Sequence, residues 1–186
     1  MMKALKENPI AAQSKQMILK ALLELMGRKA YHSISIKELA EYAGLDRKTF
    51  YRNFKSKEDV LYLRLHELCQ LYRKELEKLP QFTLYSITKA YFIICKQDAD
   101  FFMLLKKNDL LPLALMKFDE YLAELITLFL DDPAYRRKSQ YEIYYQAGGF
   151  WNVTIRWLEG GAKESPEEMA QIIGAIMPPL KIEERM

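Results

Sequence analysis

One glycine lies between two helix-start signals, and this short stretch constrains the fold more than any other part of the sequence. Ser35 is followed three residues later by Glu38, a spacing typical of a capping box at the start of a helix. Gly44 allows a left-handed turn, and Asp46 can accept hydrogen bonds from the free amides of a following helix. The stretch therefore predicts two short helices joined by a tight turn.

The rest of the sequence also predicts helices. Apolar residues recur at spacings of three and four, Ser56 with Asp59 marks a further helix start, and Pro80 ends that helix. Seven glycines and seven prolines are too few for a loop-rich β-sandwich. We expect an all-α protein with nine helices, at residues 11–26, 36–43, 47–54, 57–79, 83–96, 99–107, 112–130, 138–159 and 166–177.

The formal net charge of +3 is distributed unevenly along the chain. The first 79 residues carry 16 Lys and Arg against 10 Asp and Glu, a net charge of +6, and the remaining residues carry −3. A basic N-terminal part suits a polyanionic partner. A solvated charged face without any partner explains the same numbers equally well, so charge alone leaves both explanations open.

The two short helices and the connecting Ala43, Gly44 and Leu45 have the pattern of a helix-turn-helix, whose second helix lies in the major groove of DNA. In the second helix Phe50 and Phe54 are four residues apart and face inward. The side chains that then project outward are Arg47, Lys48, Thr49, Tyr51 and Arg52. Cationic groups attract phosphates, and base edges need fixed donors and acceptors, so this strip suits double-stranded DNA.

Residues 34–58 closely resemble the DNA-binding signature of the tetracycline-repressor (TetR/AcrR) family, and the similarity extends over about residues 11–60. The resemblance is specific because threonine, tyrosine, phenylalanine, lysine and glutamate all fall in register. It implies that Tyr51 and Lys57 bind phosphates, the lysine with help from the start of its helix. The residues implied to approach bases or nearby phosphates are Arg47, Lys48 and Thr49.

Two positions depart from the commonest family pattern. Asp46 stands where serine or threonine is usual; it still caps a helix, but its charge would lie near phosphates. Lys48 stands where a small residue is frequent, and it either reaches the DNA or is simply solvated. For Tyr51 the alternative is a half-buried ring that only holds its helix in place. The DNA sequence preference of the family therefore does not transfer.

The resemblance also implies a two-part organisation. Residues 1–56 would form the DNA-binding domain, 57–79 a long connecting helix, and 80–186 a C-terminal regulatory and dimerisation domain. In this family the middle helices commonly enclose an effector pocket, so we expect a small apolar or aromatic effector. The candidate lining residues are Tyr91, Phe102, Met116, Tyr145 and Asn152. Aromatic residues at helical spacing more often form core, and only Asn152 and Arg156 would offer polar anchors.

The last two long helices are the expected dimer interface, because related proteins dimerise through these helices as a four-helix bundle. Residues 148–168 also resemble one C-terminal subtype of the family. Gly148 and Gly149 lie within a helix, where glycine is costly, so close approach of another helix is a plausible reason for them. The candidate interface residues are Tyr144, Gly148, Trp151, Ile155, Ile172, Ile173 and Ile176. Burial within one subunit is the alternative.

The sequence gives little support for catalysis or a metal site. His32 and His66 lack a nearby nucleophile and carboxylate pattern, and Cys69 and Cys95 lack metal-ligand spacing, so we expect no enzyme, no metal and no cofactor. Two cysteines in a chain of this size favour a reducing compartment. No signal peptide or membrane-spanning run is present, and we expect a cytoplasmic protein without membrane association.

The predicted function is that of a homodimeric transcription regulator that represses by binding palindromic DNA and is released by a small-molecule effector. The first alternative is a co-regulator whose pocket is filled by its own aromatic residues and whose C-terminal domain responds to a protein partner. The second is a small helical enzyme with an incidental DNA-like module, against which the missing base and nucleophile argue.

Overall fold

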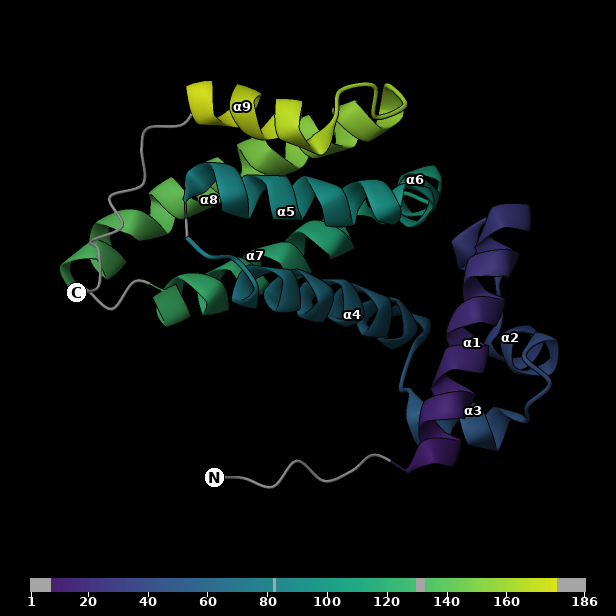
Figure 1. Cartoon of the computed structure of the whole chain (residues 1–186). Coiled ribbons are helices and arrows are strands. Elements are labelled where there is room, and N and C mark those ends of the chain that lie inside the picture. Colours follow the sequence, from purple (N-terminus) through teal and green to yellow (C-terminus); the bar gives the residue numbers. More distant parts are fainter. Residues whose placement is uncertain (1–7, 82, 130–132, 177–186) are drawn as a thin grey trace. The chain divides into compact units, whose positions relative to one another are not determined.

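The computed structural model describes residues 8–81, 83–129 and 133–176, with side chains omitted at 122–129, 133–140, 142, 143 and 146. All secondary structure in these residues is helical (Figure 1). The helices are α1 (Pro9–Arg28), the 3₁₀ turn η1 (Tyr31–Ser33), α2 (Ile36–Tyr42), α3 (Arg47–Asn53), α4 (Lys57–Glu77), α5 (Leu84–Gln97), α6 (Ala99–Lys107), α7 (Leu111–Phe129), α8 (Pro133–Glu159) and α9 (Pro166–Ile176). The expected all-α fold with nine α-helices is confirmed over the described ranges.

Two helices begin two or more residues earlier than expected, and each begins with a proline. Helix α1 begins at Pro9, because the side chain of Asn8 accepts the N–H of Ile10 at 3.0 Å and proline suits a first helical position. Proline also begins α8, at Pro133 instead of the expected residue 138. The turn η1 was not predicted, and the expected helix ends at 130 and 177 lie outside the described residues.

The chain divides into two compact units, Met1–His66 and Glu67–Met186, and the division falls within α4. In the first unit α1 packs against α2 and α3. The side chains that close this core are fully or almost fully buried; they include Ile18, Leu22, Met26, Leu39, Phe50, Phe54 and Leu61. Apolar positions spaced three and four apart on α1 therefore face the helix-turn-helix, which is held in place by hydrophobic burial.

The turn between α2 and α3 has a left-handed glycine, as the sequence predicts. Gly44 has φ +69°, and its N–H donates to the carbonyl of Glu41 at 3.0 Å. The N–H of Leu45 donates to the carbonyl of Ala40 at 2.9 Å. This pair of hydrogen bonds is the Schellman arrangement, which satisfies carbonyls left open at a helix end. The turn thus fixes the direction in which the chain enters α3.

Asp46 caps the start of α3. Its Oδ1 atom accepts the backbone N–H of Thr49 at 2.6 Å. This bond from Thr49, with smaller contributions from the charges of Arg52 and Lys48, lowers the pKa of Asp46 below its ordinary value. The prediction of an aspartate cap at this position is confirmed, and the carboxylate is the form that the folded protein favours.

In the second unit α5 packs along α9 and also contacts α6 and α8, while α7 packs against α8 (Figure 1). Its centre is aromatic: the ring of Phe92 stacks on Phe150 with centroids 5.5 Å apart and meets Trp157 edge-on at 5.1 Å. Buried polar groups find partners in this core. The hydroxyl of Thr154 on α8 bonds to that of Tyr91 on α5, with the two oxygens 3.1 Å apart.

Helix α4 is bonded to two other helices of the second unit. The hydroxyl of Tyr72 donates to the carbonyl of Ile87 on α5 at 3.2 Å, and the hydroxyl of Tyr121 on α7 donates to the carbonyl of Cys69 at 2.5 Å. Cys95 is buried and Cys69 half-buried, and neither forms a disulfide within the described residues. None of the described helices is both long enough and apolar enough to cross a membrane.

The cap at Asp46 makes the stability of the fold depend on pH. Because the folded protein lowers the pKa of Asp46, its carboxylate stabilises the fold above the unfolded pKa of about 3.9, and this contribution is lost as the pH falls through the folded pKa. In the Asp46→Asn variant the amide oxygen caps without ionising. We expect urea unfolding to favour the variant increasingly as the pH is lowered from about 6 to about 3.

All other carboxylates are common to the two chains, so the difference between their unfolding free energies isolates Asp46. A difference that stays constant over this pH range would contradict the prediction.

Candidate nucleic-acid interface

Helix α3 has one buried side and one exposed side. Phe50 is fully buried, and Phe54, which caps the end of the helix, is buried as well. The side chains of Arg47, Lys48 and Arg52 are exposed. The expectation that the two phenylalanines face inward is confirmed. Because Lys48 and Arg52 lie two residues before and after Phe50, the helical repeat turns them away from the core.

Tyr51 stands between the core and the solvent. Its side chain is 51% exposed, and its ring meets that of Phe50 edge-on with centroids 5.5 Å apart. The guanidinium of Arg47 lies 5.9 Å from the centroid of the Tyr51 ring. Thr49 is half-buried. The ring is thus held by packing on one side while the exposed part remains available for a directional hydrogen bond.

The first turn of α4 is held by a reciprocal capping box, as the spacing of Ser56 and Asp59 predicts. The N–H of Asp59 donates to Oγ of Ser56 at 3.3 Å, and the N–H of Ser56 donates to Oδ2 of Asp59 at 3.1 Å. The same carboxylate oxygen accepts the N–H of Lys55 at 2.8 Å. The start of α4 is therefore bonded to the chain that leaves α3.

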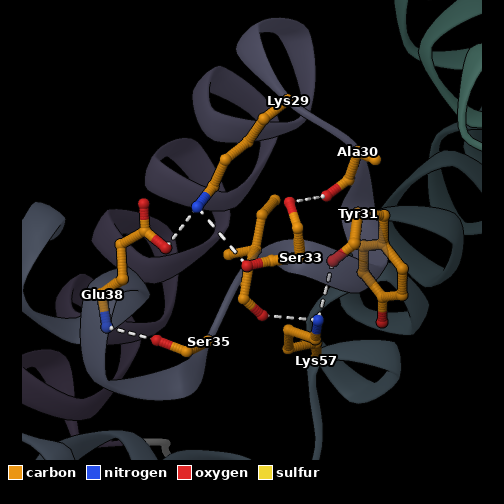
Figure 2. A network of polar contacts seen from close by, with 8 residues as sticks. Lys29, Ala30, Tyr31, Ser33, Ser35, Glu38 and Lys57 are labelled. Atoms are coloured by element: carbon orange, nitrogen blue, oxygen red, sulfur yellow. Dashed lines mark hydrogen bonds and ion pairs between the residues drawn. The ribbon is translucent and has the colours of Figure 1, made fainter.

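Lys57 lies in a different environment from the one that the resemblance suggests. Its Nζ atom donates to the carbonyl oxygens of Tyr31 at 2.8 Å and of Ile34 at 2.6 Å (Figure 2). The side chain is half-buried, and burial lowers the pKa of Lys57. The phosphate role of Lys57 stays a prediction, but its ammonium already has two acceptors within the protein.

A second lysine bonds the same connection between α1 and α2. Nζ of Lys29 lies 2.5 Å from Oε2 of Glu38 and 3.5 Å from the carbonyl of Ser33 (Figure 2). The hydrogen bond from Lys29 lowers the pKa of Glu38. Ser35 accepts the N–H of Glu38 at 3.1 Å, which is the serine half of the predicted capping box. The roles of Lys29 and Ser33 were not predicted, because both residues lie between the predicted helices.

The candidate effector residues fall into two groups. Tyr91 and Phe102 are buried: the ring of Tyr91 lies 4.8 Å from that of Phe150, and the ring of Phe102 lies 5.9 Å from that of Trp151. The other three candidates, Met116, Tyr145 and Asn152, are exposed. The five side chains therefore do not share one environment, and Tyr91 and Phe102 pack as parts of the aromatic core.

The candidate dimer residues also fall into two groups, one buried and one exposed, which lie on different sides of their helices. Trp151, Ile155 and Ile173 already pack in the core of one subunit, and their place in a dimer interface stays a prediction. The exposed candidates are Tyr144, Gly148, Ile172 and Ile176. On α8 they continue a face with Tyr141 and Tyr145, whose side chains are 82% and 84% exposed. Tyr141 was missed, although it lies three and four residues before Tyr144 and Tyr145.

A groove of about 450 Å³ lies beside the turn from α8 to α9. It is lined by Val153, Arg156, Trp157, Gly160, Lys163, Glu164, Met169 and Ile172. Nε of Arg156 donates to Oδ1 of Asn152 at 3.1 Å, so the two predicted polar anchors bond to each other one helical turn apart. Asn152 does not line the groove, whereas Arg156 does.

His32 lies in η1 and His66 in α4. Within the described part of the chain, His, Cys, Asp and Glu side chains form no group of three that could hold a metal ion.

Comparisons with known proteins identify both parts of the chain. Residues 18–62 match the model of the bacterial regulatory proteins of the tetR family, and residues 83–178 match a model described as a transcriptional regulator C-terminal region. No curated protein sequence matches the chain. The resemblance carried by residues 34–58 is therefore confirmed by family models rather than by an individual relative.

Solved structures share the fold at low sequence identity. The dihydroxyacetone kinase operon activator DhaS is 19% identical, with 88% of this chain and 93% of that chain covered and a TM-score of 0.56. FadR from Bacillus halodurans, a fatty acid degradation regulator, is 21% identical, with 92% and 96% covered and a TM-score of 0.55. FadR from Bacillus subtilis in complex with stearoyl-CoA is 19% identical, with 87% and 96% covered and a TM-score of 0.52.

These likenesses show a common fold, and the family models show more, because the C-terminal model alone spans over half of the sequence. Together with the helix-turn-helix geometry of α2 and α3, they establish that the chain belongs to the TetR family of bacterial transcriptional regulators.

Proposed function

We propose that the protein is a homodimeric repressor that binds palindromic double-stranded DNA through α3 and releases it when a small apolar or aromatic effector binds the C-terminal domain, residues 80–186. Residues 1–56 act as the DNA-binding domain and 57–79 as the connecting helix. The observation that carries the proposal is the exposed strip of α3, opposite the buried Phe50.

The strip has the chemistry that groove binding needs. Arg47, Lys48 and Arg52 bring three exposed cations to a helix of two turns, within a segment of net charge +6. Tyr51 adds a hydroxyl on a ring that packs against Phe50, so its direction is fixed before DNA arrives. Fixed donors give register on the phosphate backbone, and arginine and lysine give base readout of guanine. Thr49 lies at the inner margin of the strip.

The exposed apolar face of α8 and α9 supports a dimer. Tyr141, Tyr144 and Tyr145 follow one another at helical spacing toward Gly148, and a side chain added at Gly148 would meet nothing within 4 Å. An exposed aromatic and small-residue face suits close packing of a partner helix. A two-fold axis would give two copies of α3, which reach successive major grooves about 34 Å apart.

The effector part of the proposal rests on a shift between two populations. A ligand releases DNA only if it binds the form with misplaced recognition helices better than the DNA-competent form. The Bacillus subtilis FadR structure contains stearoyl-CoA, so an acyl thioester is the first ligand to test on this chain. DhaS is described as an operon activator, and a promoter-reporter assay therefore has to decide the sign of regulation.

One observation favours the second candidate, a co-regulator without a small-molecule effector. Tyr91, predicted to line a pocket, packs against Phe92, Phe118 and Phe150, and its hydroxyl bonds to Thr154. Side chains that already pack and hydrogen-bond with one another in this way offer fewer contacts to a ligand. In that case the C-terminal domain would respond to a protein partner.

The Tyr51→Phe variant tests the DNA-binding strip. The phenol contributes one hydrogen bond to a phosphate, so we expect about 1 kcal/mol weaker binding, or roughly fivefold, to all DNA sequences alike. Fluorescence anisotropy would measure this with a palindrome that the protein selects from a random library. Arg47→Ala and Lys48→Ala are the comparison variants, and we expect them also to relax specificity. Unchanged affinity in all three would mean that α3 is not the recognition helix.

The Tyr145→Glu variant tests the dimer. Placing a charge on the exposed face of α8 costs desolvation in any apolar interface that covers it, so sedimentation equilibrium should show a shift toward monomer. Affinity for a full palindrome should fall with it. The matched control is Tyr85→Glu, which changes an exposed tyrosine on α5 and should leave the dimer intact. Equal behaviour of the two variants would argue against this interface.

The effector is tested by a thermal-shift screen of acyl-CoA thioesters and small aromatic compounds, followed by anisotropy with DNA. A ligand at about 100 times its Kd should stabilise the fold by about 2.7 kcal/mol and weaken DNA binding. A stabilising ligand that leaves DNA affinity unchanged at saturation contradicts effector release. If nothing stabilises the protein while a pull-down retains a protein partner, the co-regulator is the correct function.

A further inference from the structure

The ammonium of Lys57 is enclosed by the connection between α1 and α2, residues 29–35. It donates to two carbonyl oxygens, of Tyr31 and Ile34, and lies 4.3 Å from the centroid of the Tyr31 ring. Lysine has three donors, and two of them are used here. Carbonyl oxygens that lie at the end of a short turn need such donors, because the turn has few backbone partners of its own.

The two accepting carbonyls belong to one structural turn. The N–H of Ile34 donates to the carbonyl of Tyr31 at 3.1 Å, and that of Ser33 donates to the carbonyl of Ala30 at 3.0 Å. Lys57 bonds two carbonyls of this turn, those of Tyr31 and Ile34. The first residue of α4 is thereby bonded to residues 23 and 26 positions earlier in the sequence.

The bonded turn leads directly into α2. Lys29 bonds the carbonyl of Ser33 and the carboxylate of Glu38, and Ser35 caps the helix by accepting the N–H of Glu38 (Figure 2). A path of hydrogen bonds therefore runs from the first residue of α4 through η1 to the first turn of the helix-turn-helix. All of its members lie in the first unit of the chain.

Binding a phosphate through more than its one remaining N–H would require Lys57 to leave these acceptors. The two carbonyl oxygens would then lose a charged donor in a half-buried place, where the stem of the lysine is also covered. Lys48 faces no such loss, because its side chain is exposed on α3. Of these two lysines, Lys48 is placed to bind DNA, whereas Lys57 is placed to stabilise the connection between α1 and α2.

We infer that Lys57 is a positioning residue, which bonds the start of α4 to the α1–α2 connection and so fixes the helix-turn-helix for DNA, instead of binding a phosphate itself. This inference rests on the proposed function for its effect on DNA, but the bonds themselves can be tested in the free protein.

The test compares Lys57→Met, which keeps the length of the side chain and removes the ammonium, with the matched Lys48→Met. Anisotropy is measured over a series of salt concentrations. A lost phosphate contact reduces the slope of log affinity against log salt by about 1, and we expect this for Lys48→Met. For Lys57→Met we expect weaker binding with an unchanged slope, because no phosphate contact is lost.

Hydrogen exchange in the free protein provides the second measurement. In Lys57→Met the amides of Ser33 and Ile34 should exchange about tenfold faster, as expected when a charged hydrogen bond is removed, whereas Lys48→Met should leave them unchanged. If Lys57→Met does not fold, Lys57→Gln keeps an amide that can donate to one carbonyl and should show an intermediate increase.

The inference is overturned if Lys57→Met lowers the salt slope by about 1 and leaves exchange at Ser33 and Ile34 unchanged. Unprotected amides there in the wild-type protein would also overturn it. If the wild-type protein shows no salt-dependent DNA binding, the proposed function fails, and the exchange measurement still decides the role of Lys57.

Discussion

The burial of Phe50 determines what the N-terminal domain can present to a partner. In a helix of two turns, one side chain fixed in the core sets the direction of all the others, because successive residues are rotated by a constant angle. With Phe50 inside, Lys48 and Arg52, each two residues away, lie on the outer side, and Arg47 at the first helical position is exposed as well. A chain that buried another position of α3 would turn these cations away from a groove, whatever its net charge.

The parts of this domain that sequence could predict are those governed by local rules. The left-handed Gly44 and the caps at Ser35, Asp46 and Ser56 all use bonds between residues that are close in the chain. Lys57 shows the limit: its acceptors lie more than twenty residues away and are backbone atoms, so side-chain spacing carries no record of them. A family resemblance can suggest a role for such a residue, but its hydrogen-bond partners are seen only in the three-dimensional structure.

In the C-terminal domain the limit has a different cause. Helix α8 is apolar on two sides, one facing its own subunit through Trp151 and Ile155 and one facing outward through Tyr141 and Tyr145. Hydrophobic pattern alone cannot separate a core face from a face that a second subunit covers, since water is excluded from both. Residues of the two faces were therefore merged into a single predicted interface. The structure distinguishes the two faces, because it shows which side of α8 is buried against its own subunit.

Helix α4 is bonded to different elements at its start and in its later turns. Its first residue is bonded to η1 through Lys57, and in its later turns Cys69 and Tyr72 are bonded to α7 and α5. A hydrogen bond is directional and short, so a small displacement of a helix end breaks it instead of stretching it. An effector that moved α4 would therefore act on DNA binding by changing which of these bonds persist. A ligand that bound both arrangements of α4 equally well would leave the populations, and therefore DNA binding, unchanged, however tightly it bound.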